Sequence, residues 1–244
     1  MNKFINTDEI STATINHFTR RDSLLNIIKC KYFEPRFCLE NIDHLDWKKF
    51  LGVDNACKLA YPMVCFTDLS HDKWHIHKQK YGDCVITLSE EWKLRNHLAP
   101  MIYLSNNFLS QNLLTNCLKM ARFYCKDHPE LEGYENFINL FIPYLKLYKE
   151  GDNRYYDERE WRFSPWKGMD GLALCIPEEE YKIETIRKQR QDEVLSNTDN
   201  LLYFNFDDIV NVEVPEEVAD TIVSALCESF GVSKNVAKNK ITKI

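Results

Sequence analysis

The chain has 244 residues, of which 44% are apolar, 13% aromatic and 28% charged, the composition of an ordinary globular protein. A disordered chain, a coiled coil and a fibre are thereby excluded. The formal net charge of -6 argues against a protein that coats nucleic acid, and only 7 glycines with no GxGxxG or P-loop string argue against a glycine-rich phosphate loop.

The predicted compartment follows from the lack of a signal peptide and of a membrane span in the sequence. Residues 1–9 contain no apolar core of a signal peptide, and no segment approaches the roughly 18 apolar residues of a membrane span. We expect a cytoplasmic protein with no membrane partner. The 9 cysteines are odd in number, the chain is large enough to fold without disulfides, and no Cys-x-x-Cys pair indicates zinc. We therefore expect reduced thiols.

The first part of the chain predicts strands that alternate with helices. Strand-forming runs occupy residues 14–19, 61–67, 83–89 and 101–104. Amphipathic or capped runs predict helices over residues 24–32, 45–51, 73–80 and from Glu90 onwards. Asp22 or Ser23 is the expected N-cap of the first helix. The rest of residues 33–60 carries loop signals.

The middle of the chain differs in character. Apolar residues recur at three- and four-residue spacings over 107–126 and 133–149, with a turn at His128-Pro129 between them. We expect two helices here. They form an insertion between sheet segments at about 105–150.

The last part of the chain returns to mixed elements. Strand signals lie at residues 161–163, 172–176, 201–206 and 209–214. Helices are predicted over 178–188 and over 216–230, the latter framed by Pro215 at a first helical position and by Gly231. The basic segment 234–244 is predicted to form a closing strand or a tail. With no internal repeat, we expect residues 1–244 to form a single α+β domain.

The densest cluster of polar and aromatic side chains is RYYDEREWR, residues 154–162. Along a strand, Glu158, Glu160 and Arg162 would share one face, because side chains alternate. Such a carboxylate pair could divide labour, one group holding a substrate hydroxyl and the other handling a proton, with the arginine keeping them ionised. The alternative is a solvated sheet edge with alternating charges.

His17 lies within the first predicted strand, just before Thr19 and the basic pair Arg20 and Arg21. A lone histidine can be a satisfied structural residue. Its functional alternative is to hydrogen-bond a ribose or a phosphate.

A metal site and two kinds of nucleophilic site have little support in the sequence. His71 and His75 would lie one turn apart on a helix, with Asp68 nearby, but no third ligand is evident and no HExxH string occurs. We therefore expect no metal. The GxSxG elbow of serine hydrolases and an evident cysteine nucleophile string are both missing.

Several segments occur in a recognisable order: HFT, LLNIIK, EPRFCLE, PMVCFTDL, YGDCVITLSEEW and YYDEREWRF. This order, from about Ile15 to the C-terminus, resembles the AbiGi family of bacterial abortive-infection proteins, which is labelled a phage-resistance antitoxin. More distantly it is similar to the ADP-ribosyltransferase fold, with its split β-sheet core. In that fold a first-strand histidine or arginine, a middle aromatic or hydroxyl residue and a late glutamate occur in sequence.

The resemblance implies NAD as a substrate and assigns roles to residues of this chain. Glu160 would bind the ribose 2′-hydroxyl and stabilise the developing positive charge, and Glu158 would orient or deprotonate the acceptor. His17, supported by Thr19, would hold an NAD ribose.

The remaining contacts to NAD stay open between alternatives. The middle position of the motif is Tyr81 or Thr67. The nicotinamide would stack on Tyr81 or Phe66. The pyrophosphate would bind Arg20, Arg21 or Arg162.

Two hypotheses remain. The first is an NAD-dependent ADP-ribosyltransferase that acts as a toxin-like effector of phage defence, is restrained by a partner, and modifies a protein, RNA or DNA acceptor. The second is a non-enzymatic antitoxin that binds a toxin and keeps the fold as a scaffold, since a fold alone does not establish activity. The retained His17, Glu158 and Glu160 favour the first.

Overall fold

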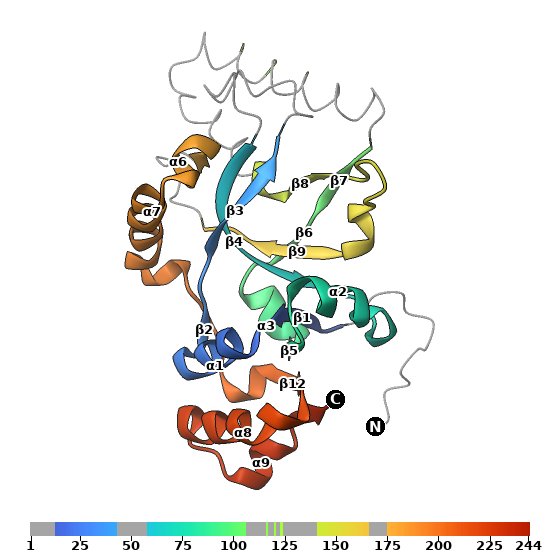
Figure 1. Ribbon diagram of the computed structural model, residues 1–244, viewed down its shortest axis with the longest axis vertical. Helices are drawn as coiled ribbons and strands as arrows, with labels where there is room; N and C mark the ends of the chain where they lie inside the picture. Colours follow the sequence, from blue (N-terminus) through green and yellow to red (C-terminus); the bar gives the residue numbers. More distant parts are fainter. Residues whose placement is uncertain are drawn as a thin grey trace.

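The computed structural model describes residues 13–42, 58–105, 141–165 and 175–244, together with the single residues 116, 120 and 123. The helix predicted at 45–51 lies outside the described residues, as do nearly all of the helix at 107–126 and most of that at 133–149. The described residues form a mixed α+β fold, which confirms the predicted class (Figure 1).

A nine-stranded sheet forms the centre of the molecule. Its strands in chain order are β1 (Ile15–Thr19), β3 (Arg36–Asn41), β4 (Lys58–Thr67), β5 (Cys84–Leu88), β6 (Ala99–Pro100), β9 (Glu160–Phe163), β10 (Ile176–Pro177), β12 (Ile209–Val214) and β13 (Ile241–Lys243). The main order is β13-β12-β5-β1-β4-β9-β6, and β3 and β10 also pair with β4. Within this sheet the β12–β13 pair is parallel and the other pairs are antiparallel.

Two short strand pairs lie beside this sheet. They are β2 (Tyr32–Phe33) with β11 (Leu202–Tyr203), and β7 (Ile102–Leu104) with β8 (Leu145–Leu147). The helices are α1 (Arg21–Cys30), α2 (Trp74–Tyr81), α3 (Glu90–Arg95), α6 (Glu178–Lys182), α7 (Glu184–Ser196), α8 (Glu216–Phe230) and α9 (Lys234–Lys238). Short 3-10 helices include η2 (His71–Lys73), η4 (Ile142–Tyr144), η5 (Tyr155–Glu158) and η7 (Phe206–Asp208).

Alternation along the central strands separates two apolar layers. Ile15 of β1 and Ile86 of β5 belong to the main core with side chains of α1 and α8. Phe18 and Val85, at positions of opposite parity, pack instead with Trp74 of α2. Helices α1 and α8 therefore cover one face of β1 and β5, and α2 covers the other.

Strand β4 joins two parts of the sheet and was predicted too short. Its first half pairs with β3 from Lys58 to Met63, and its second half pairs with β9 from Val64 to Thr67. Residues 36–41 were predicted as loop because of Pro35 and Asn41, yet they form β3. Pairing with a strand distant in sequence overrides such local signals.

Several boundaries also differ from those predicted. Helix α1 begins at Arg21 with Arg20 as its N-cap, so Asp22 lies in its first turn instead of capping it. The single helix predicted over 178–188 is two helices, α6 and α7, separated at Ile183. Residues 142–147 form η4 and β8 where a helix was predicted, and β8 pairs in parallel with β7.

Position 82, directly after α2, requires a glycine because of its backbone conformation and because of the neighbouring backbone of Thr19. Its φ is +132°, and a Cβ there would lie 2.4 Å from the backbone oxygen of Thr19. We expect Gly82→Ala to lower the free energy of unfolding by about 2–4 kcal/mol, from backbone strain and overpacking together. Urea denaturation measures this.

The matched control for Gly82→Ala is Gly151→Ala. Gly151 also has a positive φ, of +57°, but no atom of the described residues lies within 4 Å of the position that a Cβ would take there. Gly151→Ala should lower the free energy of unfolding by about 1–2 kcal/mol, from the left-handed backbone alone. Equal losses in the two variants would contradict the close contact with Thr19.

Candidate functional site

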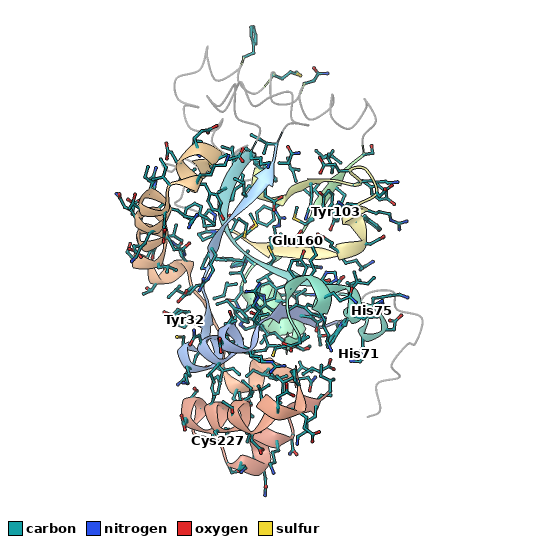
Figure 2. All side chains as sticks on the ribbon, viewed as in Figure 1. Tyr32, His71, His75, Tyr103, Glu160 and Cys227 are labelled. Atoms are coloured by element: carbon teal, nitrogen blue, oxygen red, sulfur yellow. The ribbon has the colours of Figure 1, made fainter. Side chains whose placement is uncertain are left out.

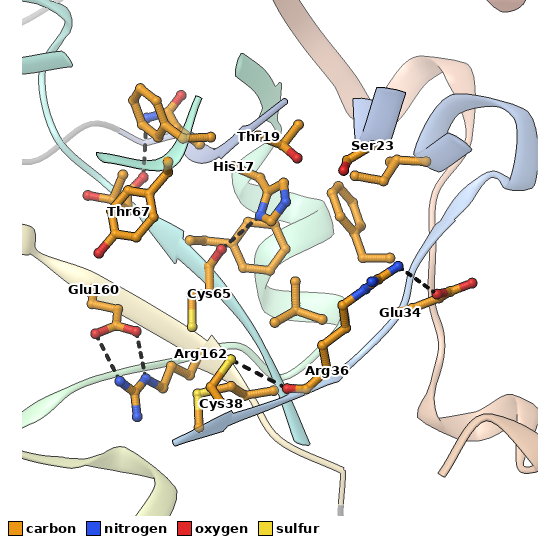
Figure 3. Close-up of a pocket in the computed structure, with 18 of the residues that line it drawn as sticks. His17, Thr19, Ser23, Glu34, Arg36, Cys38, Cys65, Thr67, Glu160 and Arg162 are labelled. Atoms are coloured by element: carbon orange, nitrogen blue, oxygen red, sulfur yellow. Dashed lines mark hydrogen bonds and ion pairs between the residues drawn. The ribbon is translucent and has the colours of Figure 1, made fainter. Parts of the chain in front are cut away.

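A cavity of about 620 Å³ lies among β1, α1, β2, β3, β4 and β9. In Figure 3, His17 lies near its centre, Glu160 and Arg162 lie to one side, and Ser23 and Glu34 lie to the other. This volume is typical of a site for a small organic molecule.

His17 is held at the cavity by its backbone environment. Its Nδ1 lies 2.9 Å from the carbonyl oxygen of Cys65 on the neighbouring strand β4. A carbonyl only accepts, so Nδ1 carries the proton. Burial lowers the pKa of His17 below its ordinary 6.5, against a smaller upward effect of the Cys65 bond. The ring is therefore neutral near pH 7, and Nε2 is a hydrogen-bond acceptor.

Six charged side chains of alternating sign form a row beside the cavity, and all of them except Lys80 line it. In order they are Lys80, Glu158, Lys146, Glu160, Arg162 and Glu40, and we call them the charge chain. Successive N···O distances are 2.6, 2.9, 3.0, 2.7 and 2.7 Å. The charge chain connects α2, η5, β8, β9 and β3.

Glu160 is the most strongly perturbed carboxyl of the charge chain. Burial alone would raise its pKa, but Arg162 and Lys146 outweigh burial and lower that pKa from 4.5 to about 2. Burial lowers the pKa of Lys146, but the neighbouring carboxylates raise it by more, so the net shift is upward. These groups therefore stay ionised at neutral pH.

Both carboxylate oxygens of Glu160 accept hydrogen bonds from cations of the charge chain. Oε1 accepts from Nε of Arg162 at 2.7 Å, and Oε2 accepts from Nη2 of Arg162 at 3.1 Å and from Nζ of Lys146 at 3.0 Å. Arg162 is only 1% exposed and also donates to Glu40 and to the carbonyl of Pro143. The arrangement is a buried, neutralised ion network.

Glu158 lies close to Glu160, but the two residues do not share one face of a strand as predicted. Strand β9 begins at Glu160, while Glu158 ends η5, and Arg159 between them has a left-handed backbone with φ of 45°. The two carboxylates nevertheless meet, because both bind Lys146. Sequence reasoning missed Lys146 and Glu40, which come from distant segments and carried no local signal.

Most of the other predicted site residues line the cavity. Thr19, Phe66, Thr67 and Tyr81 do so. Thr67 Oγ1 donates to the backbone oxygen of Glu158 at 2.7 Å, so it fixes the end of η5. Phe66 lies in the main core, and Tyr81 is 41% exposed.

The arginines at the start of α1 lie apart from the cavity lining. Arg20 is exposed and is not among the lining residues. Arg21 pairs with Asp83 at 3.0 Å and with Glu217 at 2.8 Å on the surface. Of the three arginines predicted to bind pyrophosphate, only Arg162 lines the cavity, and its partners are two carboxylates and the carbonyl of Pro143.

The histidines considered for metal binding have other partners. His71 lies in η2 and His75 lies in α2, both apart from Glu160 (Figure 2). His71 Nε2 lies 2.8 Å from Glu213, and Asp68 pairs with Arg159 at 2.7 Å. Among the described residues, no group of three or more His, Cys, Asp or Glu side chains is placed to hold a metal ion.

The fold and the cavity define an α+β protein whose paired acidic residues are bound by its own cations. A family model described as "Putative abortive phage resistance protein AbiGi, antitoxin" matches residues 31–215, more than half of the chain. The chain belongs to this family, which confirms the resemblance found in its motifs and its link to anti-phage defence. No curated protein and no solved structure matches it.

The prediction of an NAD-dependent ADP-ribosyltransferase is wrong, because the family is described as an antitoxin. The predicted transfer to a protein, RNA or DNA acceptor has no support either. The match begins at residue 31, after His17, Thr19 and Arg20. The ADP-ribosyltransferase-like core stays a prediction. Within the described part of the chain, no helix combines the length and apolar character needed to cross a membrane.

Proposed function

We propose that this chain is the non-enzymatic antitoxin of an abortive-infection pair and neutralises a cognate toxin protein by binding it. The family description supports the antitoxin role. The structural observation that carries the proposal is the occupation of both Glu160 oxygens by Arg162 and Lys146.

This occupation favours a scaffold over a catalyst on electrostatic grounds. A carboxylate that stabilises positive charge on a substrate has to direct its own negative charge at the reacting atoms. Here two cations at about 3 Å already cancel that charge. The Lys146–Glu160 pair joins β8 to β9 and the Arg162–Glu40 pair joins β9 to β3, so the network holds together the elements around the cavity.

Growth of the bacterial host separates an antitoxin from an effector. The toxin of the same defence locus, this chain, and both together are produced in parallel cultures. We expect arrest with the toxin alone, normal growth with this chain alone, and restored growth with both. The two proteins should also co-purify.

Glu158→Gln is the matched variant in this experiment. It removes the charge of the predicted acceptor-orienting group but leaves Glu160 and Arg162 paired, so rescue should persist. Growth arrest by this chain alone would overturn the proposal, as would failure both to rescue and to co-purify. NAD stays a predicted ligand of the cavity and is compared below with uncharged molecules.

A further inference from the structure

The charges around the cavity disfavour an anionic ligand. Carboxylates outnumber cations in the described lining, where Glu34, Glu40, Glu158 and Glu160 face Arg36, Lys146 and Arg162. Each of these three cations is paired with at least one of the four carboxylates. A phosphate at Lys146 or Arg162, which are 15% and 1% exposed, would have to displace a carboxylate. Arg36 is 78% exposed and lies 3.4 Å from Glu34, so it is the more available cation, but the lining still carries four carboxylates against three cations.

Apolar and aromatic side chains form much of the remaining wall. Ile27, Phe33, Val64 and Phe66 line the cavity, and the ring centroids of Phe33 and Phe66 lie 5.1 and 5.4 Å from that of His17. Phe33 and Phe66 are 1% and 3% exposed, so a small part of each ring borders the cavity as apolar surface against which a planar ring can lie.

Two neutral histidines line this cavity, and one of them leaves a hydrogen-bond acceptor available. His17 uses Nδ1 on Cys65, so Nε2 accepts. His77 also lines the cavity and is only 7% exposed, and its Nδ1 is buried with no hydrogen-bond partner among the described residues. Burial lowers the pKa of His77 too. This Nδ1 is closed to solvent, so the acceptor that a ligand in the cavity can reach is Nε2 of His17.

We infer that the cavity binds an uncharged planar heterocycle of nucleoside size, which packs on the aromatic wall and donates a hydrogen bond to Nε2 of His17. The hydroxyls of Thr19 and Ser23 line the same cavity and can bond polar substituents of such a ligand. This inference goes beyond the antitoxin function and does not depend on it.

The test uses adenosine, guanosine, cytidine and uridine, each compared with its 5′-monophosphate, and NAD. Binding to the purified full chain is measured by titration calorimetry. We expect at least one nucleoside to bind with a Kd below about 1 mM and its monophosphate to bind at least tenfold more weakly. This comparison uses the wild-type chain and is independent of variant folding.

Two histidine variants locate the site. His17→Phe keeps an aromatic ring but removes the acceptor, and it should weaken nucleoside binding at least tenfold. His75→Phe changes an exposed histidine outside the cavity lining and should leave affinity unchanged.

Several outcomes would overturn the inference. They are the failure of all four nucleosides to bind, equal or tighter binding of the monophosphate or of NAD, and unchanged affinity in a folded His17→Phe variant. Because growth rescue is measured separately, failure here is distinguishable from failure of the antitoxin function.

Discussion

Glu160→Gln is expected to lower the free energy of unfolding by about 3–5 kcal/mol, the usual effect of removing one partner from a buried ion pair. The substitution preserves shape but leaves the guanidinium of Arg162, which is 1% exposed, with Glu40 as its remaining carboxylate. Lys146 keeps Glu158 but loses its second carboxylate. Urea denaturation followed by circular dichroism measures the loss.

Glu158→Gln is the control within the same charge chain. Its partner Lys80 is 54% exposed and can be hydrated, and Lys146 keeps Glu160. We expect a smaller loss, of about 1–2 kcal/mol. If Glu160→Gln costs no more than Glu158→Gln, then the network does not stabilise the fold in the way its burial indicates.

Short central strands could be predicted from sequence because their patterns are local. The runs at 14–19, 83–89 and 209–214 correspond to β1, β5 and β12 within a residue or so. Helix α8 was predicted at its observed bounds, since Gly231 ends it with a left-handed backbone. Pro215 is its N-cap and not its first residue.

Elements that depend on distant pairing could not be predicted in this way. Strand β3 follows Pro35 and resembles a loop, but the backbone of β4 pairs with it along six residue positions. Strand β8 lies in a run with helical spacing and is stabilised as strand by β7. In both cases the partner is separated in sequence, so no local pattern contains the information.

In the candidate site, too, residues close in sequence could be predicted and residues from distant segments could not. Glu158, Glu160 and Arg162 could be named because they are sequence neighbours. Their role depends on Lys146 and Glu40, which the fold brings from β8 and β3. Residue spacing suggested two carboxylates available to a substrate, whereas their cationic partners make them part of a closed network.

Acid should destabilise the protein through Glu160. Its pKa is about 2 in the folded state against an ordinary 4.5, so the unfolded chain takes up the proton first as the pH falls. The stabilising contribution of this carboxylate is complete above 4.5 and is lost between 4.5 and 2, by about 3 kcal/mol. Burial lowers the pKa of His17, so the neutral ring adds a further loss that begins below 6.5.

Urea denaturation of the wild type and of Glu160→Gln over a series of pH values isolates the carboxylate. The wild type should lose stability steeply below pH 4.5. The variant, which lacks the titrating group, should start less stable and lose about 3 kcal/mol less over the same interval. Both proteins should show the shallower decline below 6.5 that the lowered pKa values of His17 and His77 cause. Parallel profiles below 4.5 would contradict the conclusion that Arg162 and Lys146 hold Glu160 ionised, because a carboxyl with an ordinary pKa makes no pH-dependent contribution to stability.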